Sequence, residues 1–484
     1  MTRKRSIYFL TFCQIPLKDH STKVLVRIRT TSFTVFQNQS KFIVMVRVAI
    51  VGCAHGKLDE IYDTVRHMNE MDPVHPIRLL LCCGDFQSMR NNADLETMAC
   101  PPKYRALNSF HEYYAGKKTA PVLTAFIGGN HEASNYLMDL RYGGWVAPRI
   151  FFLGFAGVIR IGGLRIAGLS GIFKPHAYHS GHFETMPLDQ KTMRSVYHIR
   201  QLEIYRLSLL QHPQSDKIDI FLSHDWPRGV EQYGDVGKLV SKKPFFRKEI
   251  QANTLGNPAT EYLLHELKPL YWFAAHLHVK FAAIVPQNSC PTELESDSND
   301  SDSPNNHEMD RITSSTRFLA LDKCLPGRDF LQVLEFPDAL KEAPGNEEEL
   351  LIKFDAEWLA ILKATYHLET RSQMEIPLPN EKICVGSEEI DFVYSQVKKF
   401  KSKGSKWPNE WITEFVKTVP THEEEPNVVA VRPGNPQTDT LLAFLELQHV
   451  VTVPYERKEA TKDPNAITLD DEEMENKETF NLIG

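Results

Sequence analysis

The sequence predicts an α/β fold in which two sheets pack against each other and helices flank them. Strand-like and helix-like segments alternate from residue 45 to residue 286, which is typical of strands joined by crossover helices. Within this stretch, three short strand-like runs follow one another directly at 149–169 and indicate a second sheet. Ligands gather beyond the carboxyl ends of the strands in such folds, so we expect the functional site at that edge.

The individual elements are assigned from apolar runs and their spacing. Strands are expected at 46–51, 77–83, 122–127, 149–153, 157–161, 164–169, 218–222 and 271–275. Helices are expected at 58–69, 104–114 and 195–211. Two later strand-like runs, 316–321 and 330–336, would complete the same domain, and helices at 354–366 and 391–399 would belong to a smaller C-terminal region.

Charge and composition divide the chain into five parts. The 484 residues carry a net charge of −7, but residues 1–44 carry +7 and residues 286–484 carry −19. The stretch between them is mildly basic, which leaves room for an anionic substrate. The predicted parts are a basic N-terminal extension (1–44), the α/β domain (45–286), an acidic disordered linker (287–312), a C-terminal region (313–456) and an acidic tail (457–484).

Composition also limits which classes of protein this chain can belong to. No apolar run approaches the length of a membrane span, so we expect no membrane partner. Eight cysteines, with Cys82 and Cys83 adjacent, do not form a disulfide pattern, so a special cysteine would be a ligand or nucleophile. Residues 1–44 resemble a transit segment in composition, yet Met45 directly before the first strand favours a non-essential extension. The lysine-rich stretch 398–406 is either a solvated helix end or a nuclear import signal.

Five strands end in polar residues of the kinds that bind metal ions. A single histidine at a strand end is more often a satisfied polar residue than a ligand, but five such ends at one sheet edge favour a metal site. The five ends read Gly52-Cys53-Ala54-His55-Gly56, Gly84-Asp85, Gly129-Asn130-His131-Glu132, Ser223-His224-Asp225 and His276-Leu277-His278.

These residue types suit a centre of two divalent ions. Two ions roughly 3.5–4 Å apart need a bridging carboxylate, which Asp85 would supply. The imidazoles of His55, His224, His276 and His278 suit zinc, iron or manganese. If His276 and His278 continue a strand, both would point to the same face, where each could reach a different ion. Two ions would lower the pKa of a shared water and hold the oxygens of a phosphoryl group during its displacement.

The order of these motifs resembles the calcineurin-like metallophosphoesterases, with one departure. Their pattern begins with Asp-x-His, whereas this chain has Cys53-x-His55. The cysteine variant resembles the RNA lariat debranching enzymes. The segments that carry this resemblance are 52–56, 82–87, 101–104, 143–148, 170–174, 223–227, 275–281 and 321–326, with a looser match at 435–438. The match is dense over residues 45–336 and implies a two-sheet metallophosphoesterase sandwich.

The resemblance also implies two metal pockets joined by Asp85. One would hold Cys53, His55, Asp85 and His278, and the other Asp85, Asn130, His224 and His276. A soft thiolate in the first pocket favours Fe2+ or Zn2+ over Mg2+, and Mn2+ also suits imidazole ligands. The alternative is that Cys53 marks a degraded pocket that holds one ion or none. The family assigns a general acid to the position of His131, which would protonate the departing 2′ oxygen.

The segment 170–200 is too polar and irregular for a simple connector. It interleaves aromatic and basic side chains, which suits splayed RNA bases and their phosphates. The alternative is an ordinary surface loop with a few aromatics packed beneath it. By resemblance it is the lariat recognition loop, and its candidate substrate-binding residues are Lys174, His176, Tyr178, His179, His182, Phe183, Arg194 and Tyr197.

The resemblance implies an enzyme that hydrolyses the 2′–5′ phosphodiester at the branch point of excised intron lariat RNA with a metal-activated hydroxide. This work after splicing implies a nuclear protein. A broad-specificity metallophosphoesterase or phosphoprotein phosphatase would use the same pockets and is the main alternative. A non-catalytic RNA-binding protein would have lost ligands, whereas all seven positions are filled. The acidic C-terminal region is a candidate for a protein partner, which the sequence does not identify, and the sequence leaves the oligomeric state open.

Overall fold

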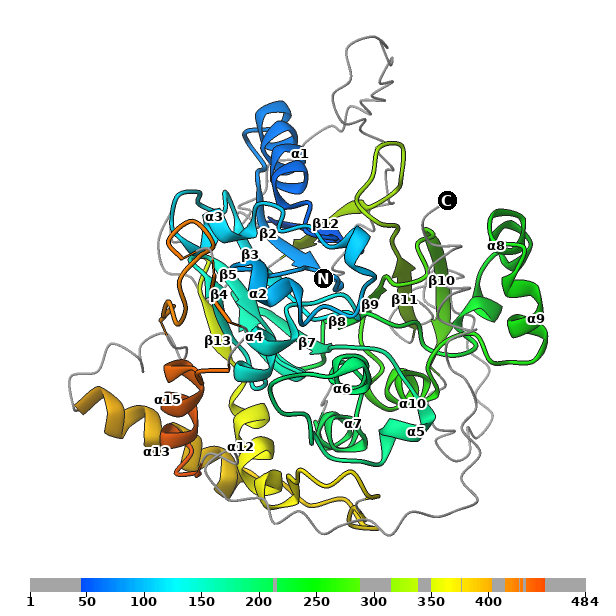
Figure 1. Ribbon diagram of the computed structural model, residues 1–484. Coiled ribbons are helices and arrows are strands. Elements are labelled where there is room, and N and C mark those ends of the chain that lie inside the picture. Colours follow the sequence, from blue (N-terminus) through cyan, green and yellow to red (C-terminus); the bar gives the residue numbers. More distant parts are fainter. Residues whose placement is uncertain are drawn as a thin grey trace, which may run out of the picture. The chain divides into compact units, whose positions relative to one another are not determined.

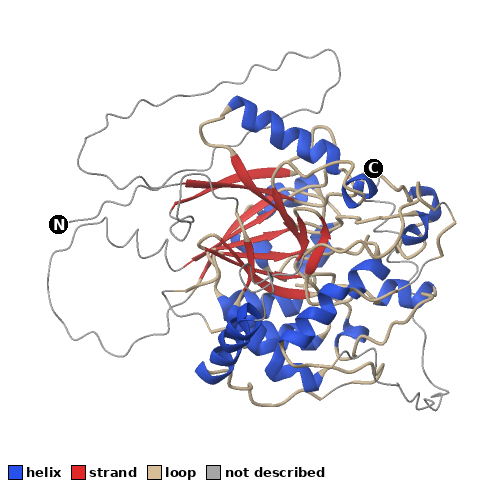
Figure 2. Ribbon diagram, turned by 90° about the vertical axis from the view of Figure 1, so that its left-hand side faces the viewer, coloured by secondary structure: helices blue, strands red, loops and turns tan. Residues whose placement is uncertain are grey.

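The computed structural model describes residues 45–211, 216–287, 315–337, 350–375, 377–402, 414–425, 427–429 and 432–448. Apart from Gln287, the predicted extension 1–44, linker 287–312 and tail 457–484 lie outside these residues. The described residues form two sheets with helices on either side of them (Figures 1 and 2). None of the helices in these ranges combines the length and hydropathy that a membrane crossing requires.

The first sheet has six strands in the order β12-β1-β2-β3-β5-β4. They are β1 (Met45–Val51), β2 (Ile77–Cys82), β3 (Leu123–Phe126), β4 (Gly144–Ala147), β5 (Ile150–Phe152) and β12 (Leu331–Pro337). Strands β1, β2, β3 and β5 are parallel, while β4 and β12 pair antiparallel to their neighbours. The carboxyl ends of the four parallel strands therefore meet at one edge.

The second sheet has seven strands in the order β10-β11-β9-β8-β7-β6-β13. They are β6 (Ala156–Ile161), β7 (Leu164–Leu169), β8 (Ile220–Ser223), β9 (Tyr271–Ala274), β10 (Phe281–Pro286), β11 (Ser315–Ala320) and β13 (Ile352–Phe354). Strands β7, β8, β9 and β11 are parallel. The predicted strands 316–321 and 330–336 thus complete one sheet each, as β11 and β12.

Alternate side chains of β1 pack on opposite faces of the first sheet, as the two-residue period of a strand requires. Val48 and Ile50 belong to the core that also contains Ile166 and Phe221 of the second sheet. Ala49 and Val51 instead pack in a second core with buried residues of α1 (Leu58–Met71). This two-sheet arrangement with outer helices confirms the fold predicted from the sequence.

Short helices connect the strands of the α/β part. They are α2 (Asn92–Leu95), η1 (Pro102–Tyr104), α3 (Phe110–Tyr114), α4 (Ser134–Asp139), α5 (Pro175–Tyr178), α6 (Gln190–Ser195), α7 (Gln201–Ser208), η2 (Val230–Tyr233), α8 (Val236–Lys242), α9 (Phe246–Gln251) and α10 (Pro258–Leu267). The C-terminal helices are α12 (Ala356–Thr365), η3 (Tyr366–Leu368), α13 (Ser387–Ser402) and α15 (Pro436–Phe444).

The C-terminal region packs into the α/β part through α12. Trp358 and Ile361 are fully buried in the core between the sheets and this helix. The buried Arg165 of β7 donates to both carboxylate oxygens of Asp355, the N-cap of α12, at 3.1 Å each. A buried pair of this kind holds the start of α12 against the second sheet.

Two predicted helices differ from the observed ones. The helix expected at 104–114 contains only α3, because Asn108 has a φ of 52°, which no α-helix accommodates. The helix expected at 195–211 is split, since α6 ends at Ser195 and α7 begins at Gln201. Between them residues 196–197 form a turn, and His198 pairs with Ile172 in an isolated β-bridge. Strands β4, β10 and β13 were not predicted.

Candidate metal centre

The predicted ligands lie in loops that directly follow five strands. Because the strands end at the same edge of their sheets, the loops bring residues from distant parts of the sequence together. Cys53 and His55 follow β1, Asp85 follows β2, Asn130 and His131 follow β3, His224 follows β8, and His276 and His278 follow β9.

The backbone of these loops is strained at the predicted ligands. His55, Asp85, His276 and His278 have φ angles of 46°, 49°, 59° and 48°, in the left-handed region. Such a conformation in a non-glycine residue costs on the order of 1–3 kcal/mol and concentrates at functional sites. The fold therefore accepts strain at four positions to direct these side chains inward.

Two glycines allow the loops to approach one another. A Cβ on Gly84 would lie 2.4 Å from His224 Nδ1, and a Cβ on Gly129 would lie 2.3 Å from Asp85 Oδ1. Both distances are far below van der Waals contact. Glycine at these two positions is thus a requirement of the site, since any side chain would displace a predicted ligand.

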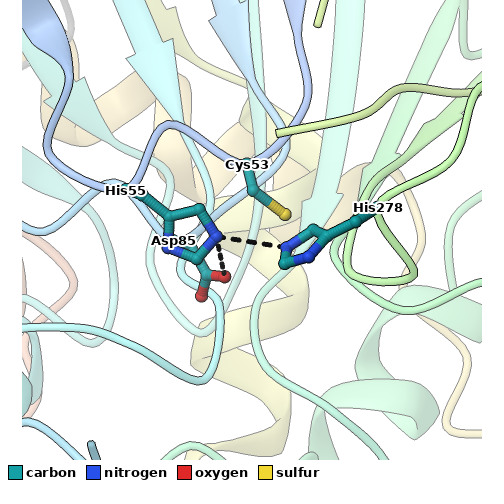
Figure 3. Close-up of side chains that lie close together, drawn as sticks. All are labelled: Cys53, His55, Asp85 and His278. Carbon is teal, nitrogen blue, oxygen red and sulfur yellow. Dashed lines mark hydrogen bonds and ion pairs between the residues drawn. The ribbon is translucent and has the colours of Figure 1, made fainter. Parts of the chain in front are cut away.

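The first cluster consists of Cys53, His55, Asp85 and His278 (Figure 3). Each offers one ligand atom, and these atoms all lie within 4.8 Å of one another. His55 Nε2 lies 3.1 Å from His278 Nε2 and 3.6 Å from Asp85 Oδ2. Two lone pairs that face each other at this distance need a proton or a cation between them. The donor set, a thiol, two imidazoles and a carboxylate, fits a transition-metal ion.

The second cluster shares Asp85 with the first. His224 Nε2 lies 3.5 Å from Asp85 Oδ1 and 3.2 Å from Asn130 Oδ1. The rings of His224 and His276 lie 5.0 Å apart between centroids. The two carboxylate oxygens of Asp85 thus face different clusters, as a residue that bridges two ions must.

Outer hydrogen bonds orient the ligands. His224 Nδ1 donates to the Cys83 carbonyl at 2.7 Å, which leaves the lone pair of Nε2 available to bind the same ion as Asn130 Oδ1 and Asp85 Oδ1. The His276 amide donates to Cys53 Sγ at 3.2 Å, which ties the loop after β9 to the loop after β1. A sulfur that accepts such a bond is suited to the thiolate form.

Burial sets the protonation of the ligands before any ion is considered. It lowers the pKa of His55 to about 4 and also lowers the pKa of His278 and His224. These imidazoles are therefore neutral at physiological pH, which is the form that binds metals. Burial and the nearby Asp85 raise the pKa of the Cys53 thiol. A bound cation would offset that cost, because metal binding and thiol ionisation are coupled.

His131 lies beside the second cluster without being part of it. Its Nδ1 lies 3.1 Å from the Ala99 carbonyl, which only accepts, so Nδ1 carries a hydrogen. Its Nε2 then accepts from the Asn130 side-chain amide at 3.1 Å. Its main-chain amide donates to Asp85 Oδ1 at 3.0 Å, which fixes its position relative to the bridging carboxylate. Nε2 is therefore the atom able to gain and give a proton.

The expected strand geometry of His276 and His278 is wrong. Strand β9 ends at Ala274, and both histidines lie in the following loop with left-handed φ angles. Alternation along a strand therefore does not orient them. They still diverge, His278 toward Cys53 and His55 and His276 toward His224, because the loop backbone turns between them.

Comparison with known proteins places this geometry in a family. Residues 46–280 match the model of the calcineurin-like phosphoesterases, and residues 313–450 match that of the lariat debranching enzyme C-terminal domain. A lariat debranching enzyme from Arabidopsis thaliana is 41% identical over 429 residues, which cover 88% of this chain and 92% of that protein. The chain belongs to the lariat debranching enzyme family. The Drosophila melanogaster member is 44% identical over 83% of this chain and 77% of its own length.

The human member of the family is 52% identical over 320 residues, which cover 66% of this chain but 54% of that protein. The mouse member is covered to a similar extent, 53%. The chain thus spans about half the length of these curated relatives. The calcineurin-like phosphoesterase match implies the use of divalent metal ions, in agreement with the first cluster.

The loop that the family resemblance singled out, residues 170–200, begins at the end of β7 and contains α5 and α6. Two of its candidate RNA-binding residues, His176 and His179, are exposed, and the other six are partly buried. His182 and Phe183 have partners inside the protein: His182 Nε2 donates to Glu203 at 2.8 Å, and the Arg200 guanidinium lies 5.7 Å from the Phe183 ring. Tyr178 packs against Phe173, with 5.3 Å between ring centroids.

One residue near the site has a role that the sequence did not reveal. Glu132 Oε1 accepts from the amides of Phe86 and Gly129, and its Oε2 accepts from the amide of Gln87. It thereby joins the loops after β2 and β3 and makes no bond to His131. A glutamate two residues after the ligand position Asn130 was visible in the sequence, but its partners in the loop after β2 were not.

Proposed function

We propose that this chain hydrolyses the 2′–5′ phosphodiester at the branch point of excised intron lariat RNA. The observation that carries the proposal is the cluster of Cys53, His55, Asp85 and His278, in which a thiol stands at the position where other calcineurin-like enzymes have aspartate. Membership of the lariat debranching enzyme family supports the same substrate. Such work would take place in the nucleus, after splicing.

The chain would hold two divalent ions, which we propose to be Fe2+, Zn2+ or Mn2+. The thiol and neutral imidazoles of the first cluster favour these ions over Mg2+, which prefers oxygen ligands. When bound, such ions would supply Lewis-acid activation of water and neutralise charge on the phosphate.

The chain's own residues would contribute position and proton transfer. Asp85 fixes the spacing of the two clusters through its two oxygens. His131, whose ring orientation is set by the Ala99 carbonyl, would gain a proton from solvent on Nε2, which here accepts from the Asn130 amide, and would then give that proton to the departing 2′ oxygen. General acids of this kind contribute typically about 10²–10⁴-fold to the rate.

The experiment is a comparison of substrates. A synthetic 2′–5′ branched RNA, its linear 3′–5′ isomer and a phosphopeptide are offered to the metal-loaded wild-type chain and to His131→Ala. We expect selective cleavage of the branch, and a loss of about 10²-fold or more in His131→Ala with the metal content unchanged. Equal cleavage of both RNAs, or preference for the phosphopeptide, would favour a broad-specificity metallophosphoesterase or phosphoprotein phosphatase instead.

A further inference from the structure

A segment of the C-terminal region, residues 369–372, runs directly against the 170–200 loop. The amide of Gly181, inside the loop, donates to the Ser372 carbonyl at 2.8 Å. A Cβ on Gly181 would lie 2.2 Å from the Thr370 carbonyl oxygen and 2.8 Å from its carbon. The two backbones therefore touch, and only glycine permits that approach. We refer to residues 369–372 as the strap.

The strap is anchored at its first residue by buried charges. The Glu369 carboxylate accepts from Arg206 Nη1 at 2.9 Å and from the Tyr142 hydroxyl at 2.7 Å. Arg141 lies 3.8 Å away, and the side chains of Arg141, Arg206 and Glu369 are 11%, 5% and 6% exposed. Glu369 thus connects the end of η3 to α7 and to the turn after α4. Because removal of one partner would leave uncompensated buried charge, we expect a break in this anchor to be strongly destabilising.

The loop side of the contact is equally fixed. Arg200 Nε donates to the Gly181 carbonyl at 3.2 Å, and Arg200 Nη2 donates to Glu184 at 2.6 Å. Arg200 and Glu184 are almost fully buried. Gly181 is therefore held between Arg200 on one side and the strap on the other, and it lies in the middle of the loop between α5 and α6.

Apolar and charged side chains both lie behind this contact. A cavity of about 30 Å³ between the loop and the C-terminal region is lined by apolar residues such as Trp358 and Leu362 and by charged residues such as Arg141 and Glu369. The backbone contact at Gly181 is therefore one of several contacts that hold the loop. The predicted metal ligands are not among the residues that line this cavity.

We propose that the strap holds the 170–200 loop in the position that receives branched RNA, and that Gly181, Thr370 and Ser372 are positioning residues for substrate recognition. This inference rests on the proposed function, because it assumes that the loop contacts the RNA. It gives the C-terminal region a defined role, since the α/β part carries the metal centre and the C-terminal region sets the loop beside it.

The first test is Gly181→Ala in the full metal-loaded chain. We expect KM for branched RNA to rise at least tenfold, while hydrolysis of bis(p-nitrophenyl) phosphate, which needs no loop, stays within twofold. Gly237→Ala is the matched control, since a Cβ there meets only Asp235 Oδ1 at 3.5 Å. An unchanged KM for branched RNA, or an equal loss on both substrates, would overturn the inference.

The second test is independent of RNA. Amide hydrogen exchange of the peptide around Gly181 is compared between wild type and Glu369→Gln. We expect at least tenfold faster exchange there, with no change in β1. Unchanged exchange around Gly181 would contradict the proposal that the strap holds the loop. Faster exchange in β1 as well would mean that the variant unfolds generally. In that case the kinetics of Gly181→Ala decide the question. If wild type does not distinguish branched from linear RNA, the proposed function fails, yet exchange still tests the strap.

Discussion

The metal centre and the 170–200 loop are built in opposite ways. The centre is drawn from five strand ends, has four of its seven predicted ligands buried, and leaves no room for a Cβ at Gly84 or Gly129. The loop has two short helices, several exposed side chains and a small cavity behind it that is lined by apolar and charged residues. The first region cannot move without losing its ligand geometry, whereas the second depends on contacts from another part of the chain. A rigid centre is suited to catalysis, and a loop held by contacts from another part of the chain is suited to substrate selection.

Removal of the bridging carboxylate should have the largest effect. Asp85→Asn takes the shared charge from both clusters, so we expect at least a 10³-fold loss of activity toward branched RNA and bis(p-nitrophenyl) phosphate alike. Metal analysis of the purified variant should show less than one ion per chain. Asp391→Asn, on the exposed face of α13, is the control. An Asp85→Asn chain that keeps two ions would contradict the bridging role.

The close approach at Gly129 allows a sharper test, because its neighbour provides the control. A Cβ on Gly129 would meet Asp85 Oδ1 at 2.3 Å, but the nearest atom to one on Gly128 would be Leu137 Cδ1 at 3.4 Å. We expect Gly129→Ala to lower kcat on both substrates by about 10²-fold or more and Gly128→Ala by less than threefold. Similar kcat values for the two variants would show that the centre tolerates movement.

A smaller effect concerns His198, which lies near the end of the loop. Burial, followed by the charge of Arg200, lowers its pKa to about 2, so it stays neutral in the folded chain while the unfolded chain binds a proton below about pH 6.5. Unfolded chain then binds more protons, so stability falls as the pH drops. Over about 1.5 pH units, from 6.5 to 5.0, this costs about 2 kcal/mol.

Urea unfolding of wild type and His198→Gln at pH 7.5 and pH 5.0 measures that effect. The loss of unfolding free energy on acidification should be smaller in His198→Gln by about 2 kcal/mol. The difference between the two pH values cancels the packing cost of the substitution itself. Equal losses in both chains would mean that His198 is not buried as a neutral group.

Much of the geometry of the candidate metal centre could be predicted from the sequence, because its signal is local. An apolar run that stops at Gly-Asp or Gly-Asn-His marks both a strand and its edge, and five such ends in one α/β domain must converge. What the sequence could not reveal depends on contacts between distant residues. The pairs Arg200–Glu184 and His182–Glu203 and the bond from Gly181 to Ser372 join segments whose composition alone resembles RNA-binding surface.

Parts of the fold were also missed or misjudged from the sequence. Strand β10 was missed because apolar residues occupy both of its faces, with Ile284 exposed, so no alternation was visible. The helix expected at 104–114 was interrupted by the left-handed Asn108, which periodicity does not detect. The division of the chain between the α/β domain and the C-terminal region remains a prediction, although strands from beyond residue 313 complete both sheets.

The most direct measurement separates catalysis from substrate selection in a single variant. Lys174, His176, His179 and Arg194 are replaced together by alanine, and kcat/KM is measured on branched RNA and on bis(p-nitrophenyl) phosphate. We predict a loss of at least 10²-fold on branched RNA and less than twofold on the small diester, with the metal content unchanged. If the variant loses activity toward both substrates, or toward neither, the account in which the metal centre provides catalysis and the loop selects the substrate is contradicted.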